Sequence, residues 1–380
     1  MKTLSNAQQF LNSIGFRCPG RTVPSLPAIL APATIAALFF AFLVVPLRAQ
    51  FAYVANADSG NVSGYSISSS GAMTPVPGSP FAAGLEPFSV AVDLAAKFVY
   101  VANFSGNNIS VYSIRSDGAL TSIPGSPFAA QEGPVSVRVD PKGKFAYVAT
   151  RISNNVAAYG IGSNGALTPV PGSPFATGIA PVSVAIEPAG KFAYVASKIS
   201  NDVSAYSIRS DGALAPIPGS PFPAGIGPFS VAVDPTGKFA YVVNEGDDSV
   251  SAYDVGPSGT LAPIPGSPFA AGSDPTKLAV DPRGGFAYVA NKGDDSVSGY
   301  SIGPHGALTP IPGSPFTAGS DPVDVVVDPT SKFVYVANAT GNNVSAYSIG
   351  PNGALTPLPS SPFPARIEPV SVVITRAIFK

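Results

Sequence analysis

The chain of 380 residues has few of the side chains that build reactive or cross-linked sites: one cysteine, one histidine and 11% charged residues. The cysteine, Cys18, lies among the first 49 residues, so the rest of the chain has no disulfide, no thiol nucleophile and no cysteine-ligated metal. A single histidine, His305, excludes a metal site made of several histidines, and any Ser-His-Asp triad would have to be built around it. His305 stands between a proline and a glycine, which indicates a turn residue.

Charge is balanced as well as scarce, with a formal net value of −1. A chain without a basic excess lacks the electrostatic field that holds nucleic acid, so we expect no nucleic-acid partner. Hydrophobic residues make up 45% of the chain, which is enough for a large buried core. The 39 glycines and 42 prolines recur at fixed places, which indicates ordered turns.

Residues 1–49 differ in composition from the rest. They carry four basic residues and no acidic one, and an apolar stretch over 29–45 precedes Ala49. This pattern predicts an export signal, with an uncleaved membrane anchor as the alternative. Both place residues 50–380 outside the cytoplasm, with the membrane reached only through this segment. Without it the chain keeps 17 of its 21 basic residues against 22 acidic ones, a net charge of −5.

The rest of the chain is a repeat with a period of 47 residues. A Tyr-Val pair recurs seven times from Tyr53 to Tyr335, and a second tyrosine recurs seven times from Tyr65 to Tyr347. The triplet Ser-Pro-Phe recurs with the same spacing, its phenylalanine running from Phe81 to Phe363. Seven copies without insertion or deletion indicate seven equivalent structural units.

Each copy contains four short segments rich in Val, Tyr and Phe, separated by turn residues. In segments such as residues 145–150, FAYVAT, both alternating sets of side chains are largely apolar, so the sheet must be covered on both faces. Four-stranded antiparallel sheets stacked around a ring meet this requirement. We therefore predict an all-β fold, a seven-bladed β-propeller over residues 50–380.

The phase of the repeat predicts how the ring closes. The repeat begins at Phe51, on a second strand, and ends with residues 369–374, PVSVVI, which read as a first strand with nothing after it. We expect this C-terminal strand to complete the N-terminal blade, which removes the two unpaired sheet edges. An open β-solenoid is the alternative, and it would not need complementary ends.

The strand at residues 98–103, FVYVAN, and acidic turns such as Asp140 to Lys144 resemble the YVTN repeat. The chain is also similar over residues 51–380 to the lactonase-like seven-bladed propellers, which include 6-phosphogluconolactonases. This resemblance implies the propeller fold and, as one activity, hydrolysis of a sugar lactone. It equally implies surface-layer or binding propellers, in which the repeat performs no chemistry.

In a propeller the loops from strand one to two and from three to four share one rim, called the bottom rim here. The bottom rim is nearly uniform and carries a lysine in most copies. A basic ring for an anionic partner and solvated turn lysines are the two interpretations, and we favour the second. The opposite, top rim varies between copies, so we expect it to hold any specialised site.

The candidate site residues are those where single copies depart from the repeat. Lys277 and Asp324 replace a repeated serine on first strands, and Arg138 replaces a repeated alanine. We expect all three to bind a ligand at the top rim, around the central channel. Copies five and six gather further carboxylates on the top rim, namely Asp247, Asp248, Asp274, Asp294, Asp295 and Asp321. Such a patch could hold a hard cation such as Ca²⁺ or supply a general acid and base. The alternative is exposed acidic hairpin tips, with Lys277 and Asp324 paired to each other.

The sequence favours an exported, monomeric binding or scaffold module that holds a protein or carbohydrate on its top rim, with no cofactor. The alternative is a lactonase-type hydrolase, in which a carboxylate activates water and Arg138 or Lys277 stabilises the oxyanion. A third interpretation, an adhesive array, predicts self-association.

Overall fold

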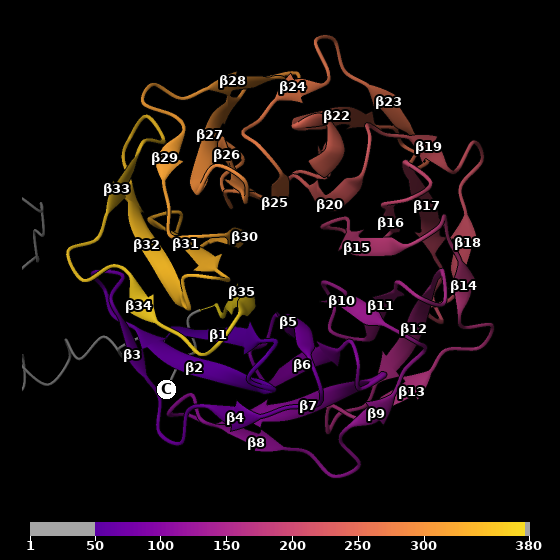
Figure 1. The fold of residues 1–380 in the computed structure, drawn as a ribbon. Coiled ribbons are helices and arrows are strands. Elements are labelled where there is room, and N and C mark those ends of the chain that lie inside the picture. Colours follow the sequence, from indigo (N-terminus) through magenta and orange to yellow (C-terminus); the bar gives the residue numbers. More distant parts are fainter. Residues whose placement is uncertain (1–49, 377–380) are drawn as a thin grey trace, which may run out of the picture. The chain divides into compact units, whose positions relative to one another are not determined.

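The computed structural model of the protein describes residues 50–376. The predicted export signal or anchor at residues 1–49, and Cys18 within it, lie outside the described residues. Seven antiparallel sheets are arranged around a ring, as Figure 1 shows. Within residues 50–376 the one helical element is a single 3-10 turn, Glu245–Asp247, and no helix is long and apolar enough to span a membrane. The predicted all-β propeller is confirmed.

Each blade has an innermost, a second and a third strand. The innermost strands are β5 (Pro87–Val92), β10 (Pro134–Val139), β15 (Pro181–Ile186), β20 (Pro228–Val233), β25 (Pro275–Val280), β30 (Pro322–Val327) and β35 (Pro369–Ile374). The second strands are β1 (Gln50–Asn56), β6 (Phe98–Asn103), β11 (Phe145–Thr150), β16 (Phe192–Ser197), β21 (Phe239–Asn244), β26 (Phe286–Asn291) and β31 (Phe333–Asn338). The third strands are β2 (Asn61–Ile67), β7 (Asn108–Ile114), β12 (Asn155–Ile161), β17 (Asp202–Ile208), β22 (Ser249–Val255), β27 (Ser296–Ile302) and β32 (Asn343–Ile349).

The fourth, outermost strand of each blade is in two pieces that both pair with the third strand. The first pieces are β3 (Met73–Pro75), β8 (Leu120–Ser122), β13 (Leu167–Pro169), β18 (Leu214–Pro216), β23 (Leu261–Pro263), β28 (Leu308–Pro310) and β33 (Leu355–Pro357). The second pieces are β4 (Phe81–Ala82), β9 (Phe128–Ala129), β14 (Phe175–Ala176), β19 (Phe222–Pro223), β24 (Phe269–Ala270), β29 (Phe316–Thr317) and β34 (Phe363–Pro364).

The Ser-Pro-Phe triplet joins the two outer pieces. In the blade of β12, Ser173 Oγ accepts a hydrogen bond from the Ala158 amide at 2.9 Å, and the Ser173–Pro174 peptide is cis. Phe175 then pairs with Val156 and packs against the buried cluster between this blade and the next. The triplet is therefore a structural element of the outer edge.

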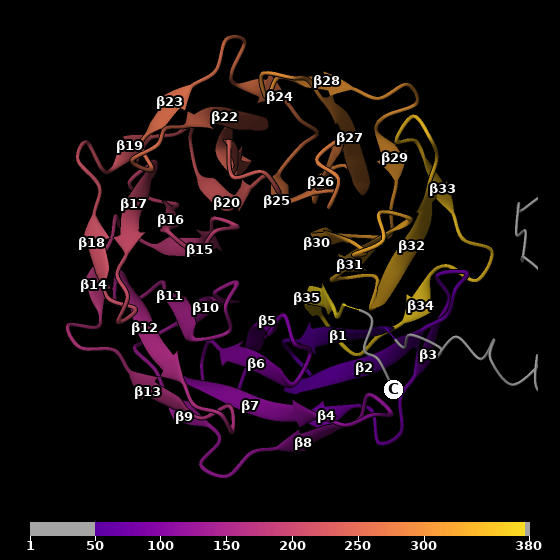
Figure 2. The same ribbon diagram turned by 180° about the vertical axis from the view of Figure 1, so that it is seen from behind.

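The ring closes by strand pairing between the two ends of the repeat. Strand β35 pairs antiparallel with β1, with Val372 opposite Val54. Thr375 fixes the end of this pair, because its Oγ1 accepts from the Phe51 amide at 2.9 Å and its own amide donates to the Phe51 carbonyl at 2.8 Å. Figure 2, the view from behind, shows the yellow strand β35 on the inner side of the ring beside the indigo strand β1. The predicted closure is confirmed.

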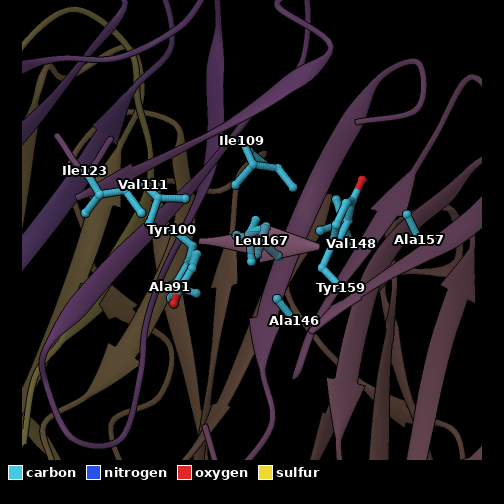
Figure 3. Close-up of a cluster of buried hydrophobic side chains, with 12 residues drawn as sticks. Ala91, Tyr100, Ile109, Val111, Ile123, Ala146, Val148, Ala157, Tyr159 and Leu167 are labelled. Atoms are coloured by element: carbon cyan, nitrogen blue, oxygen red, sulfur yellow. The ribbon is translucent and has the colours of Figure 1, made fainter. Parts of the chain in front are cut away.

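The core consists of seven apolar layers between adjacent blades. Figure 3 shows the layer between the blades of β6 and β11, where Tyr100 and Ile109 lie with Val148 and Leu167 in one buried cluster. Every blade except at its outer edge is thus covered on both faces, which is why its strands are apolar on both faces.

Two tyrosines in each blade also link it to its neighbours through hydrogen bonds. The second-strand tyrosine reaches forward: Tyr147 Oη donates to the Gly212 carbonyl of the next blade at 3.0 Å. The third-strand tyrosine reaches back: Tyr253 Oη donates to the Pro223 carbonyl of the preceding blade at 2.7 Å. Tyr335 and Tyr65 make the same two links across the closure, to Gly71 and Pro364. The repeated tyrosines therefore connect adjacent blades by hydrogen bonds.

Contacts between loops confirm the expected grouping into rims. On the bottom, Gly165 in a three-to-four turn has φ +85°, and a Cβ there would lie 2.5 Å from Phe98, which follows a one-to-two loop. On the top, Asn154 Oδ1 accepts from the Ala180 amide at 2.8 Å, joining a two-to-three loop to a four-to-one loop. The basic side chains that the sequence places on the one-to-two loops of the bottom rim are exposed: Lys97, Lys144, Lys191, Lys238, Arg283 and Lys332.

Candidate functional site: the charged channel

The seven innermost strands line the centre of the ring (Figure 1). Their third residues form a belt around it. Five members of this belt are serines, and the other two are Lys277 on β25 and Asp324 on β30. The serines are Ser89, Ser136, Ser183, Ser230 and Ser371. The repeat therefore supplies a uniform polar belt, which two adjacent blades interrupt with charge.

Four of the five belt serines tie their innermost strand to the next one. The Val137 amide donates to Ser89 Oγ at 3.2 Å, and the Val184 amide donates to Ser136 Oγ at 3.2 Å. The same bond joins Val231 to Ser183 and Val90 to Ser371, each at 3.3 Å. An innermost strand has one free edge, and these side chains satisfy an amide on that edge. The serines of the belt therefore have a structural role.

Asp324 keeps this structural bond and has one carboxylate oxygen left over. Its Oδ2 accepts from the Val372 amide at 2.8 Å, in the manner of a belt serine. Its Oδ1 is buried and has no hydrogen-bond partner, and the residue as a whole is only 5% exposed. Burial raises the pKa of the Asp324 carboxyl, while Lys277, the Val372 amide and Arg138 oppose that rise. A carboxylate with a raised pKa and a free oxygen is suited to accept a proton.

Two cations share the channel with Asp324. The pKa of Lys277 is lowered to about 8, mainly by burial and then by the nearby Arg138 charge, while Asp324 opposes the shift. Burial also lowers the pKa of Arg138. Its Nη1 donates a hydrogen bond to the carbonyl oxygen of the preceding residue, Val137, at 2.9 Å. No ion pair within 4 Å joins Lys277 to Asp324 in the described channel. The predicted simple pairing of these two residues is therefore not what the structure shows.

Arg138, Lys277 and Asp324 face one cavity of about 170 Å³, which is otherwise lined mainly by valines of β5, β30 and β35. A second cavity, of about 220 Å³, is lined by Arg138, Lys277 and residues of β15 and β20. Because Arg138 belongs to β10, three blades away from both β25 and β30, ring closure alone brings these charges together. The walls of the first cavity carry two cations and one carboxylate, and those of the second carry the two cations alone.

A ring of apolar side chains lies between this charged region and the top rim. These side chains come from the second residues of the innermost strands and line a small cavity of about 50 Å³ together with Lys277 and Asp324. They are Phe88, Val135, Val182, Phe229, Val323 and Val370. The amino group of Lys198 sits 5.0 Å from the ring centre of Phe229, so the top-rim loops touch this collar. The three charged residues therefore lie inside the channel, below the top rim.

The top-rim acids of copies five and six bind loop amides. Asp248 Oδ1 accepts from the Asp274 amide and Asp295 Oδ1 from the Asp321 amide, each at 2.8 Å. Asn154 and its counterparts make this bond in other blades. Asp294 Oδ2 accepts from the Ser273 amide at 2.6 Å. Asp247 makes the matching bond to the Ile226 amide, where other copies use a serine. These hydrogen bonds show that the four carboxylates stabilise the conformation of the top-rim loops.

Asp274 and Asp321 contribute those amides and remain at the rim surface. Asp321 also accepts from Thr340 Oγ1 at 2.9 Å and lies 3.7 Å from the Lys292 amino group. Across residues 50–376 no group of three or more His, Cys, Asp or Glu side chains is arranged to hold a metal ion. The Ca²⁺ site considered from sequence therefore stays an untested prediction.

Two further motifs lie away from the channel. His305 is exposed on a three-to-four turn of the bottom rim. Gly299 to Gly303 has the spacing G-x-S-x-G, but most of it lies within β27, where Ser301 pairs with Phe286, so it forms no strand-to-helix nucleophile elbow.

Sequence reasoning missed the serine belt and the apolar collar. The signal for both was present, because Pro, an apolar residue and Ser recur with the 47-residue period at the start of five of the seven innermost strands. The structural role of the serines depends on the hydrogen bond that an innermost-strand amide donates to the serine of the preceding blade. A single copy of the repeat does not show this bond between blades.

Comparison with known proteins agrees with this architecture. The family model for lactonase, 7-bladed beta-propeller, matches residues 39–123, 120–220 and 208–374. Among solved structures, a candidate 6-phosphogluconolactonase from Bacteroides fragilis is 20% identical with a TM-score of 0.77, over 87% of this chain and 99% of that one. A second candidate 6-phosphogluconolactonase, from Bacteroides uniformis, is 18% identical with a TM-score of 0.75, over 86% and 99%.

The periplasmic gluconolactonase of Pseudomonas aeruginosa is 18% identical with a TM-score of 0.73, over 87% of this chain and 99% of that one. No curated protein matches the chain. At these identities the solved structures establish the fold, and the family model covers most of the sequence. The chain therefore belongs to the family of lactonase seven-bladed β-propellers.

Proposed function

We propose that this protein hydrolyses a sugar lactone in its central channel. The observation that carries the proposal is the cavity in which Arg138, Lys277 and Asp324 meet, since these residues replace the repeat's uncharged side chains. Charges withdrawn from solvent are unfavourable for stability unless they are paired; Asp324 is buried, Arg138 and Lys277 are partly buried, and none of the three lies within ion-pair distance of a partner among residues 50–376. Membership of the lactonase family supports the same conclusion.

Asp324 acts as the base in this proposal. Its free Oδ1 takes a proton from a water molecule while the water oxygen bonds to the lactone carbonyl carbon. The negative charge that forms on the carbonyl oxygen is held by Lys277 or Arg138. The ring C–O bond then breaks, and the departing alkoxide takes the proton back from Asp324. The products balance as lactone plus water giving one hydroxy acid.

The apolar collar supports such a reaction physically. Phe88, Phe229 and the valines beside them restrict the channel on its top side, which lowers the local dielectric around the charges. In a less polar environment the attraction between a cation and a developing oxyanion is stronger than in water.

We place the reaction outside the cytoplasm. The basic, then apolar, composition of residues 1–49 supports export. A gluconolactonase from Pseudomonas aeruginosa with the same fold is periplasmic, in agreement with this placement.

The test measures hydrolysis of glucono-δ-lactone and 6-phosphogluconolactone above the spontaneous rate, followed by acid release at constant pH. Asp324→Asn keeps an oxygen for the Val372 amide and removes the base, so it should lower the rate by about 10²- to 10⁴-fold. The matched control is Asp254→Asn, an exposed aspartate on β22, which should leave the rate unchanged. Hydrolysis no faster than the spontaneous reaction with either lactone would overturn the proposal in favour of a binding module.

A further inference from the structure

The serine belt is broken at Lys277 on β25, because neither the junction between β20 and β25 nor the junction between β25 and β30 has the amide-to-side-chain bond of the other blades. Strand β30 pairs with β31 in the register of the other blades, with Val325 opposite Val336 as Val137 is opposite Val148. The Val325 amide therefore points to the free edge, as the Val137 amide does when it donates to Ser89. The residue in the position to accept from Val325 is Lys277, and an ammonium group only donates. The Val325 amide is left without its belt acceptor.

Ser230 on β20 stands next to this break and has an unused hydroxyl group. It is 1% exposed, and its Oγ has no hydrogen-bond partner, although the other four belt serines each accept from an amide. The amide that would match it in the repeat is that of Leu278, which directly follows Lys277. A buried hydroxyl without a partner is unfavourable, so this position is stabilised when a ligand bonds to it.

The groups at the break are hydrogen-bond donors on the three consecutive strands β20, β25 and β30. They are the Val325 amide, the Lys277 ammonium and the Ser230 hydroxyl, which can donate because it makes no other bond. Arg138 adds a second cation to the shared cavity, against the single carboxylate of Asp324. When these groups are ionised the channel carries one net positive charge, inside a chain whose overall charge is negative. Donors and positive charge together complement the oxygens of an anion.

We propose that the break in the belt at Lys277 is a carboxylate-binding pocket, formed by the Lys277 ammonium, the Val325 amide and the Ser230 hydroxyl. This inference rests on the proposed lactone hydrolysis and extends it, because opening a lactone creates a carboxylate from the attacked carbonyl group. The pocket holds the acid product of the reaction, a sugar acid of the aldonate class. The two carboxylate oxygens divide the three donors between them.

The experiment measures binding of gluconate to the full protein by calorimetry, and by the ¹⁵N–¹H shift of the Val325 amide. Lys277→Ser restores the residue found in five other blades, and thereby the belt acceptor for Val325. This variant should fold and should bind gluconate at least about tenfold more weakly, the size expected for losing one charged hydrogen bond. In the unchanged protein, gluconate should shift the Val325 amide signal.

Ser230→Ala and Ser183→Ala form a matched pair that tests the hydroxyl group. Both remove a belt hydroxyl, but Ser183 Oγ already accepts from the Val231 amide, whereas Ser230 Oγ is unused. Gluconate binding should weaken about threefold or more in Ser230→Ala and stay unchanged in Ser183→Ala, because only the first removes a proposed ligand. Equal effects of the two substitutions, or full affinity in Lys277→Ser, would overturn the inference.

The two proposals fail separately. Asp324→Asn should lose hydrolysis and still bind gluconate, since Asp324 is the base and not one of the three donors. If the protein hydrolyses lactones and Lys277→Ser binds gluconate as tightly as the unchanged protein, the carboxylate pocket alone is contradicted. Gluconate binding that depends on Lys277, without lactone turnover, would support the pocket and contradict the proposed hydrolysis.

Discussion

The seven second-strand tyrosines allow the contribution of one interblade hydrogen bond to stability to be measured within a single protein. All seven have fully buried side chains, and six of them donate a hydrogen bond to a glycine carbonyl of the next blade. The exception is Tyr100, whose Oη is buried and has no partner. Replacing tyrosine by phenylalanine removes the same oxygen from the same kind of site, with or without a hydrogen bond.

The two kinds of substitution should change the free energy of unfolding by different amounts and in different directions. Tyr147→Phe removes the 3.0 Å bond to Gly212 and leaves that buried carbonyl without its partner, which lowers the free energy of unfolding by about 1–3 kcal/mol. Tyr100→Phe removes an unpaired buried hydroxyl, so the free energy of unfolding should stay constant or rise by up to about 1 kcal/mol. The unfolding entropy of a domain of this size is about 0.7 kcal/mol/K, so Tyr147→Phe should lower the melting temperature by about 1.5–4 °C.

Calorimetry and urea unfolding of the two variants beside the unchanged protein measure this difference. Tyr241→Phe is a repeat of the bonded case, since its Oη donates to Gly306 at 2.9 Å, and it should behave as Tyr147→Phe does. A destabilisation of Tyr100→Phe equal to that of the two bonded variants would refute the reasoning. In that case the packing of the oxygen, and not its hydrogen bond, would determine the contribution of these residues.

Two further outcomes follow from the closure of the ring and from the buried phenols. Removing residues 369–380 deletes β35 and its pairing with β1, so stability should fall by about 5 kcal/mol or more, while removing only residues 377–380 should leave the melting temperature unchanged. Equal melting temperatures for the two truncations would contradict closure. Burial raises the pKa of Tyr159 and Tyr206 to about 12 and that of the second-strand tyrosines higher still, so the folded state favours neutral phenols. Stability should therefore be intact below pH 10 and decline as the pH rises above it, with absorbance at 295 nm increasing together with unfolding; gradual titration near pH 10 in the folded protein would show that the phenols are not protected.

The blades could be predicted from sequence because their determinants repeat every 47 residues. The apolar residues on both faces of each second strand require a neighbouring sheet, and the phase of Phe51 and Ile374 requires the ends to meet. Both are consequences of local pattern and period, so they appear in one chain read alone.

The sequence by itself determined seven blades, their closure and the positions at which Arg138, Lys277 and Asp324 depart from the repeat. Only the tertiary structure showed that these three line one cavity, that half of the Asp324 carboxylate is used by Val372, and that the top-rim acids bind loop amides. The physical reason is that Arg138 and Asp324 belong to blades far apart in sequence, and only the closed ring brings them to the same channel. Which oxygen stays free depends on the amide that the neighbouring blade presents, and no repeat unit contains that amide.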